Sequence, residues 1–160
     1  MPHTVQWDVL PSEADASVNH VLAHDDGGFW ETRWVQRTSD YGIAYLSSHT
    51  GCAFSCRFCH LTATGQTMMT PASVETYVAQ MRQSLSTYQS RRAEGMPPIS
   101  RLHVNFMARG EALDNPTVVL HAQELFARLD QVAHDTQEGL DTHYLVSSIL
   151  PRTFSGDRSK

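Results

Sequence analysis

The opening residues and the segment that follows them differ in their hydrophobic pattern. Residues 1–17 show no periodicity, and we predict that they form a loose leader. Residues 18–40 carry two short β-prone runs, between Val18 and Gln36, on either side of Asp25-Asp26-Gly27-Gly28. An Asp-Gly pair between two such runs is typical of a tight turn joining antiparallel strands. We therefore predict a β-hairpin extension over residues 18–40.

From Tyr41 onward, strand-like and helix-like segments alternate. Strands are predicted within Tyr41–Ser48, around Leu102, Val104 and Phe106, and within His143–Leu150. A helix is predicted after Thr70-Pro71, with one apolar face formed by Val74, Tyr77, Val78, Met81, Leu85 and Tyr88. A second is predicted after Asn115-Pro116, with Val118, Ala122, Leu125, Phe126, Leu129 and Val132 on one side. This order predicts an α/β fold in which helical crossovers join parallel strands.

The composition is that of one folded domain. The chain has 160 residues, of which 41% are hydrophobic and 18% charged, which excludes a wholly disordered or fibrous protein. No apolar run approaches the roughly 20 residues of a membrane span, and the N-terminus shows no secretory signal, so we expect a cytoplasmic protein that does not contact a membrane. The net charge of −5 leaves no basic footprint that by itself would predict nucleic-acid binding.

The three cysteines, Cys52, Cys56 and Cys59, all lie within eight residues, in the spacing C-x3-C-x2-C. An odd number of clustered cysteines makes a poor disulfide framework, so metal or cluster ligation is the better interpretation. A four-iron, four-sulfur (4Fe-4S) cluster normally takes four thiolates, and three would leave one iron open to a small chelating molecule. A zinc site that also uses His60 is the alternative.

Two segments that carry chemistry follow consecutive predicted strands. The cysteine loop follows the first strand, and Arg109-Gly110-Glu111 follows the second. The carboxyl ends of parallel strands meet at one edge of a sheet, and ligands bind there. The sequence therefore predicts a site that combines the cysteines with the Gly110-Glu111 pair.

The loop Gly51–His60, with Phe58 before the third cysteine, resembles the signature of the radical S-adenosylmethionine (SAM) superfamily. More narrowly, Ser47–Cys52, Thr64-Gly65-Gln66 and Gly110–Asn115 resemble the RlmN/Cfr group of RNA adenine methyltransferases. The hairpin, with Asp25-Asp26-Gly27 and Glu31-Thr32, and the segment Val146–Pro151 fit that group in the same order.

The resemblance implies a ligand set and a reaction. Cys52, Cys56 and Cys59 would hold a 4Fe-4S cluster, and the contacts to SAM would come from Phe58, Gly110, Glu111, Ser147 and Ser148. An electron from an external donor such as a flavodoxin would cleave SAM into methionine and a 5′-deoxyadenosyl radical, which would act on RNA. Helix capping is the alternative role for Glu111, and a strand-end turn is the alternative for the two serines. Arg109 is either an anion-binding residue or a solvated loop residue.

The sequence departs from the RlmN/Cfr pattern in two ways. Tyr45 stands where that group has a cysteine seven residues before the first ligand, and no late cysteine exists, so the resemblance supports cluster and SAM binding better than methylation through a methylated cysteine. The superfamily folds as a partial barrel with more strand–helix units than this chain would have. Residues 41–151 would form about three such units, which correspond to the N-terminal half of a radical SAM core. A polar tail would follow at 152–160. Either a second chain completes the barrel or the chain is truncated. The alternative function is a non-catalytic cluster- or zinc-binding fragment.

Overall fold

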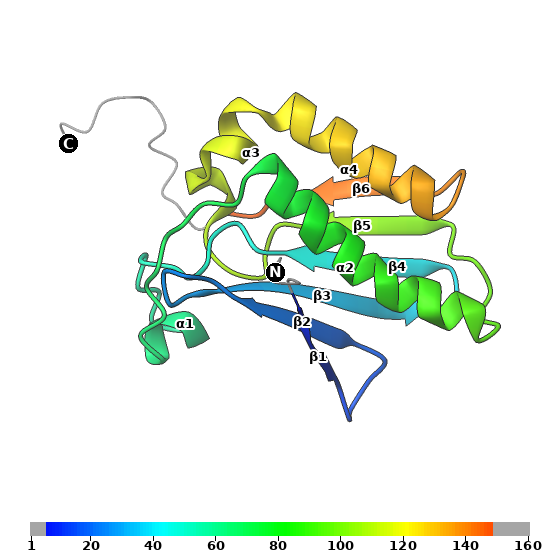
Figure 1. The fold of residues 1–160 in the computed structure, drawn as a ribbon, viewed down its shortest axis with the longest axis horizontal. Coiled ribbons are helices and arrows are strands. Elements are labelled where there is room, and N and C mark those ends of the chain that lie inside the picture. The colour runs from blue at the N-terminus through cyan, green and yellow to red at the C-terminus, as the bar shows by residue number, and fades with distance from the viewer. Residues whose placement is uncertain (1–5, 149–160) are drawn as a thin grey trace, which may run out of the picture.

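A computed structural model describes residues 6–148, which form one open sheet with helices on one face (Figure 1). The strands are β1 (Asp8–Pro11), β2 (Val18–Ala23), β3 (Phe29–Thr38), β4 (Tyr41–Leu46), β5 (Arg101–Asn105) and β6 (Asp141–Leu145). The helices are α1 (His60–Ala63), α2 (Val74–Ala93), α3 (Pro116–Leu120) and α4 (Ala122–Thr136), with a 3-10 turn η1 at Ala112–Asp114.

The sheet runs in the order β1-β2-β3-β4-β5-β6 and mixes two kinds of pairing. Strands β1 to β4 pair antiparallel, whereas β4, β5 and β6 pair parallel, with Ile43 opposite His103 and His103 opposite His143. The predicted hairpin, the parallel strands and the α/β class are therefore confirmed. The hairpin is part of the same sheet as the parallel strands, and the barrel-like arrangement stays a prediction.

Strand β1 lies within the segment that the sequence pattern assigned to a loose leader. Asp8–Pro11 pair with Val18–Val21 of β2, although all four residues of β1 are exposed. A four-residue strand that buries no side chain has no hydrophobic alternation to detect, because backbone hydrogen bonds alone hold it. The first five residues and the predicted tail at 152–160 lie outside the described residues.

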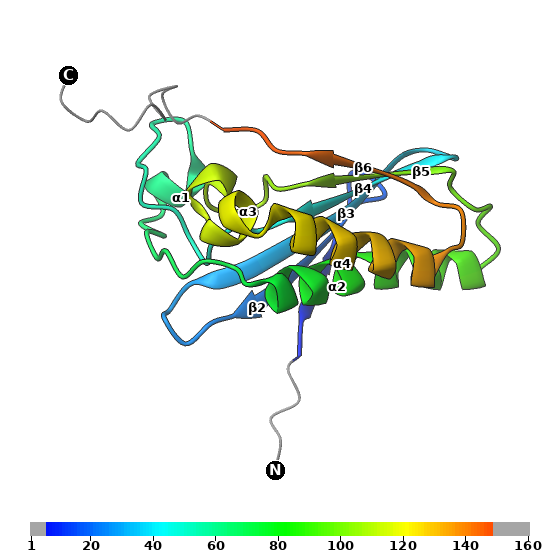
Figure 2. The same cartoon turned by 90° about the horizontal axis from the view of Figure 1, so that it is seen from above.

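The core lies between the sheet and the two long helices, α2 and α4, which lie side by side on one face (Figure 2). Its largest buried side chains come from the sheet (Trp34, Leu46, Leu102, Phe106), from α2 (Tyr77, Met81, Leu85, Tyr88) and from α4 (Leu125, Leu129). Burying one such side chain contributes about 1.5–3 kcal/mol. The apolar faces predicted for the two helices are the faces that pack here.

Both helices differ from the expected bounds at their starts. Helix α2 begins at Val74, because Ser73 is its N-cap and accepts a hydrogen bond from the Thr76 N–H, while Pro71 forms an extended bridge with His49. The helix expected after Asn115-Pro116 is divided: Asn115 caps the short α3, the helical geometry breaks at His121, and α4 follows. Within residues 6–148, no helix is both long enough and apolar enough to cross a membrane.

The parallel register places three chain segments at one edge of the sheet. The cysteine loop leaves the carboxyl end of β4, Gly110 and Glu111 follow β5, and Ser147 and Ser148 follow β6. In Figure 1 the loop, α1 and the chain around α3 all lie at this end of the sheet. A candidate site is therefore assembled from three segments that are far apart in the sequence.

Candidate functional site

A cavity of about 390 Å³ lies at this edge of the sheet, and nearly all the predicted site residues line it. The three cysteines, Phe58, Gly110, Glu111 and Ser147 belong to its wall, together with Glu31 from β3 and His60 from α1. Of the predicted residues only Ser148 is not part of this wall. The structure thus brings together residues from the cysteine loop and from the ends of two parallel strands.

The three thiols of the cysteine loop are free and half-buried. The loop turns back on itself because Ser55 adopts a left-handed conformation (φ 56°) and because the Cys59 N–H donates to the Cys56 carbonyl at 2.9 Å. Phe58 points outward, with 85% of its surface exposed. The loop therefore places its three thiols along the cavity and leaves most of an aromatic side chain in solvent.

The surroundings of the first cysteine act on the acidity of its thiol. Burial raises the pKa of the Cys52 thiol, and the neighbouring Cys59, Cys56 and Glu111 raise it further. A thiol in such surroundings becomes a thiolate when a cation binds and compensates its charge. Without a bound cation, the surroundings of Cys52 therefore favour the neutral thiol.

The donor set of the cavity fits an iron–sulfur cluster. Among residues 6–148, no three or more His, Cys, Asp or Glu side chains are grouped as ligands around one metal ion. Three free thiols nevertheless face a single cavity, and thiolates are the ligands that iron–sulfur clusters take. The cavity also contains a histidine, His60, which extends the donor set to the one that zinc accepts.

Asp26, in the turn of the β2–β3 hairpin, anchors the chain on both sides of the cysteine loop. Its Oδ2 accepts hydrogen bonds from the hydroxyls of Thr50 and Thr70, both at 2.6 Å, and its Oδ1 accepts from the Gly28 N–H at 2.7 Å. Although desolvation acts in the opposite direction, these hydrogen bonds hold the pKa of Asp26 well below its ordinary range. The hairpin turn is therefore a support for the cysteine loop as well as a connection between strands.

Two buried amides that sequence reasoning did not select fix the chain between β4 and the loop. Gln80 of α2 accepts from the Ser47 N–H at 2.7 Å and donates to the Ser47 carbonyl at 3.0 Å. Asn115 donates to the carbonyls of Ser48 at 2.8 Å and Ala72 at 3.1 Å. Asn115 ends the segment Gly110–Asn115 that carries the RlmN/Cfr resemblance, and Gln80 lies next to the apolar face of α2, but neither signal distinguishes a buried amide from an exposed one.

The Gly110-Glu111 pair is held against the start of the cysteine loop. Gly110 has φ +80°, and a Cβ built on it would lie 2.6 Å from Nδ1 of the buried His49. Glu111 is 5% exposed, and its Oε1 accepts from the Leu113 N–H at 3.3 Å. Glu111 therefore caps η1, as in the alternative interpretation, and also lines the cavity.

Arg109 is buried, with 7% of its surface exposed, so the interpretation as a solvated loop residue is wrong. Its guanidinium lies 5.6 Å from the centre of the Phe29 ring and 3.4 Å from the Glu31 carboxylate, and it also donates to the side chain of Gln66.

Tyr45, at the position where the RlmN/Cfr group has a cysteine, is half-buried on β4 between Arg33 and Asn105.

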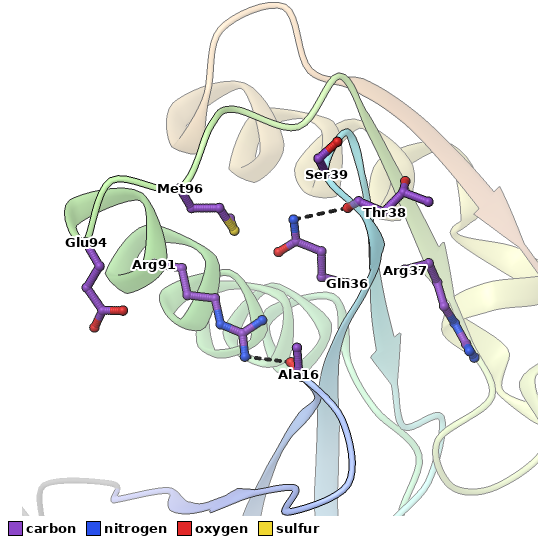
Figure 3. A pocket seen from close by; sticks show the side chains of 8 residues that line it. All are labelled: Ala16, Gln36, Arg37, Thr38, Ser39, Arg91, Glu94 and Met96. Carbon is purple, nitrogen blue, oxygen red and sulfur yellow. Dashed lines mark hydrogen bonds between the residues drawn. The ribbon is translucent and has the colours of Figure 1, made fainter.

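A larger and shallower pocket of about 680 Å³ lies near the far end of β3, at the amino end of β4 (Figure 3). Two of its polar side chains are engaged by the protein itself: Arg91 donates to the Ala16 carbonyl at 2.6 Å, and the Gln36 amide donates to the Thr38 carbonyl at 3.2 Å. None of the predicted site residues lines this pocket.

Comparison with known proteins adds evidence on the fold. No protein-family model matches the sequence, and no curated protein matches it. Among solved structures, the chain is similar to a radical SAM methyltransferase from Sphaerobacter thermophilus, with a TM-score of 0.56 and 19% sequence identity over 92% of this chain. The two chains share a fold. The match takes up 40% of the methyltransferase chain, so this protein corresponds to less than half of that length.

Proposed function

We propose that this chain is a radical SAM iron–sulfur protein that binds a 4Fe-4S cluster through Cys52, Cys56 and Cys59 and binds SAM beside it. The observation that carries the proposal is that all three thiols share one cavity with Gly110, Glu111 and Ser147. The fold likeness to a radical SAM methyltransferase supports it, because the aligned region includes most of this chain.

The residues of the cavity can each be given a physical role. When bound, the cluster supplies one electron to the sulfonium of SAM, whose cleavage supplies the radical that reacts with the substrate. The Glu111 carboxylate accepts a charge-assisted hydrogen bond from the amino group of SAM. Gly110 lines the cavity through its backbone, since the space on its Cβ side is filled by His49, and Ser147 offers a hydroxyl from the carboxyl end of the neighbouring strand, β6. Phe58 presents an aromatic face beside the cavity.

The substrate class that we propose is RNA, acted on in an RlmN/Cfr-like manner. The motif resemblance supports it, and so do two exposed aromatic side chains of the cysteine loop, Phe54 and Phe58, because aromatic rings are stacking surfaces for unpaired bases. Methylation through a methylated cysteine is not part of the proposal, since Tyr45 stands where the RlmN/Cfr group has one of the two cysteines of that route.

Two partners belong to the proposal. Reductive cleavage needs an external one-electron donor of the flavodoxin type. A second polypeptide that completes the barrel is proposed to pair with β6, which has β5 on one side and no other strand of the described chain on its other side. An unpaired edge strand presents free backbone donors and acceptors, which pair readily with a further strand.

A non-catalytic cluster- or zinc-binding role is the second candidate. The observation that favours it is that His60 lines the same cavity as the three cysteines, which completes a Cys3His donor set. In that case the protein would hold a metal without cleaving SAM.

Anaerobic reconstitution with iron and sulfide separates the two candidates. We expect a brown protein with about four irons per chain, an absorbance spectrum that changes when SAM is added, and release of 5′-deoxyadenosine under a strong reductant. Cys56→Ala should abolish iron retention, whereas Ser55→Ala, in the same loop, should leave it unchanged. A colourless protein that holds one zinc would reject the first candidate and support the second.

A second variant tests the SAM contact independently of the cluster. Glu111→Gln keeps an acceptor for the Leu113 N–H and removes the negative charge. We expect it to retain iron like the unmodified protein and to bind SAM at least about tenfold more weakly, which corresponds to about 1.4 kcal/mol. Unchanged SAM affinity would show that Glu111 serves only as a helix cap.

A further inference from the structure

Arg109 links three segments that surround the cavity, although its own side chain is not part of the cavity wall. Its guanidinium pairs with Glu31 of β3, at 3.4 Å, and donates to the side chain of Gln66. Its backbone carbonyl accepts the N–H groups of Ser48, at 2.7 Å, and His49, at 3.4 Å. One residue therefore contacts the hairpin, the chain after the cysteine loop and the chain before it.

The link to the cysteine loop passes through a single residue. The backbone carbonyl of Gln66 accepts the Cys52 N–H at 2.9 Å, while the side chain of Gln66 is held by Arg109. Cys52 follows Gly51, where an added Cβ would lie 2.6 Å from the Gln66 carbonyl oxygen, so the two segments are in direct contact. A displacement of Gln66 would therefore displace the backbone of Cys52.

The charge of Arg109 also acts on the cavity wall. A guanidinium that is 7% exposed is costly to bury unless it is paired, and its partner here is the Glu31 carboxylate, which lines the cavity and is 26% exposed. The planar fork of arginine can direct one donor to Glu31 and another to Gln66 at the same time, which a lysine ammonium on its flexible stem cannot do equally well.

We infer that Arg109 is a positioning residue of the candidate site, which fixes the Cys52 backbone through Gln66 and the orientation of the Glu31 carboxylate on the cavity wall. The consequence for SAM binding rests on the proposed function, whereas the effect on Cys52 concerns the protein without any bound group. The two can be measured separately.

Amide hydrogen exchange of the metal-free protein tests the positioning directly. In Arg109→Met, which keeps an unbranched apolar stem and removes the guanidinium with its charge and donors, we expect the Cys52 amide to exchange at least about tenfold faster, while core amides of β4 and β5 keep their rates. Arg109→Lys should give an intermediate rate. Arg128→Met is the control, because Arg128 forms an exposed ion pair with Glu75, at 3.7 Å, on the helical side.

The outcomes separate positioning from general stability. Unchanged exchange at Cys52 in Arg109→Met would overturn the inference, and so would an equal acceleration at all core amides, because a merely structural role predicts a uniform loss. These results stand whether or not the protein binds a cluster, so a failure of the proposed function is recognised separately, by the iron content of the unmodified protein.

SAM binding to the reconstituted protein gives the second measurement. If Arg109 and Glu31 act as a unit, then Arg109→Met, Glu31→Gln and the double variant should weaken SAM binding to a similar extent, about tenfold, instead of adding. If the charge of Arg109 acted only through its field, its removal would strengthen the binding of the sulfonium cation, and that result would overturn the positioning role.

Discussion

Asn115 is the buried amide on which the entrance to the cysteine loop depends most. It is fully buried and takes part in four hydrogen-bond contacts: the two N–H groups of its Nδ2 are shared among the carbonyls of Ser48 and Ala72 and the Tyr77 hydroxyl, and its Oδ1 accepts from the Thr117 N–H. Asn115→Leu keeps a side chain of similar size and removes all four. No water can reach the site to replace them without opening the core.

The magnitude follows from the partners that lose their hydrogen bonds. The two Nδ2–H donors and the Oδ1 acceptor amount to three full hydrogen bonds, each worth about 1 kcal/mol net, so the expected loss is about 3 kcal/mol. The Ser48 carbonyl is not left without a partner, because it keeps the hydrogen bond that it accepts from the Ala72 N–H at 2.9 Å. Because domains of this size unfold with about 5–15 kcal/mol, the variant should still fold but should be much less stable.

Urea denaturation of the metal-free protein, followed by circular dichroism, measures this loss. With a slope of about 2 kcal/mol per molar urea, we expect the midpoint to fall by about 1.5 M. Ser73→Ala, which removes only the N-cap of α2, should cost about 1 kcal/mol and shift the midpoint by about 0.5 M. If Asn115→Leu shifts the midpoint no more than Ser73→Ala does, the reasoning from buried hydrogen bonds is refuted.

Two further predictions concern the site loop and the pH dependence of stability. Gly110→Ala should destabilise the protein more than Gly139→Ala in the same urea assay. Both glycines have positive φ, which costs about 1–2 kcal/mol for alanine, but only a Cβ at position 110 would also collide with His49. Equal losses of stability in the two variants would contradict the close contact. His20 accepts from the Gln83 amide and donates to Thr87, and burial lowers its pKa below 6.5. The unfolded chain therefore takes up the proton more readily, so the stability from His20 is complete above about pH 6.5 and is lost on acidification. The urea midpoint should fall between about pH 7.5 and pH 5.5, and less steeply in His20→Gln; an equally steep fall would exclude His20 as a cause.

Periodicity identified the long elements well and the short ones poorly. The apolar face of α2 repeats over about four turns and predicted the helix. It could not show that the N-cap is Ser73 instead of Thr70, because that depends on the extended bridge between Pro71 and His49. In the same way, nothing in the pattern after Asn115 marks the break at His121 that separates α3 from α4. Strand β1 was missed because its pairing buries no side chain.

The candidate site was likewise predictable from the sequence only in part. The spacing of Cys52, Cys56 and Cys59 is a local property, and residues so close in the sequence share one loop in any fold, so the sequence alone determined that three thiols would be neighbours. The sequence also determined the alternation of strands and helices that places Gly110 and Glu111 after a parallel strand.

Only the tertiary structure decided how the surroundings of that loop are built. The burial of Gln80, Arg109 and Asn115 depends on how α2 packs on the sheet and on the register between β4 and β5, which no local pattern specifies. The same polar side chain is solvated on one face of a helix and buried on another. Whether it supports the site is therefore decided by the partners that packing brings to it, because a buried polar group is stable only where those partners are in place.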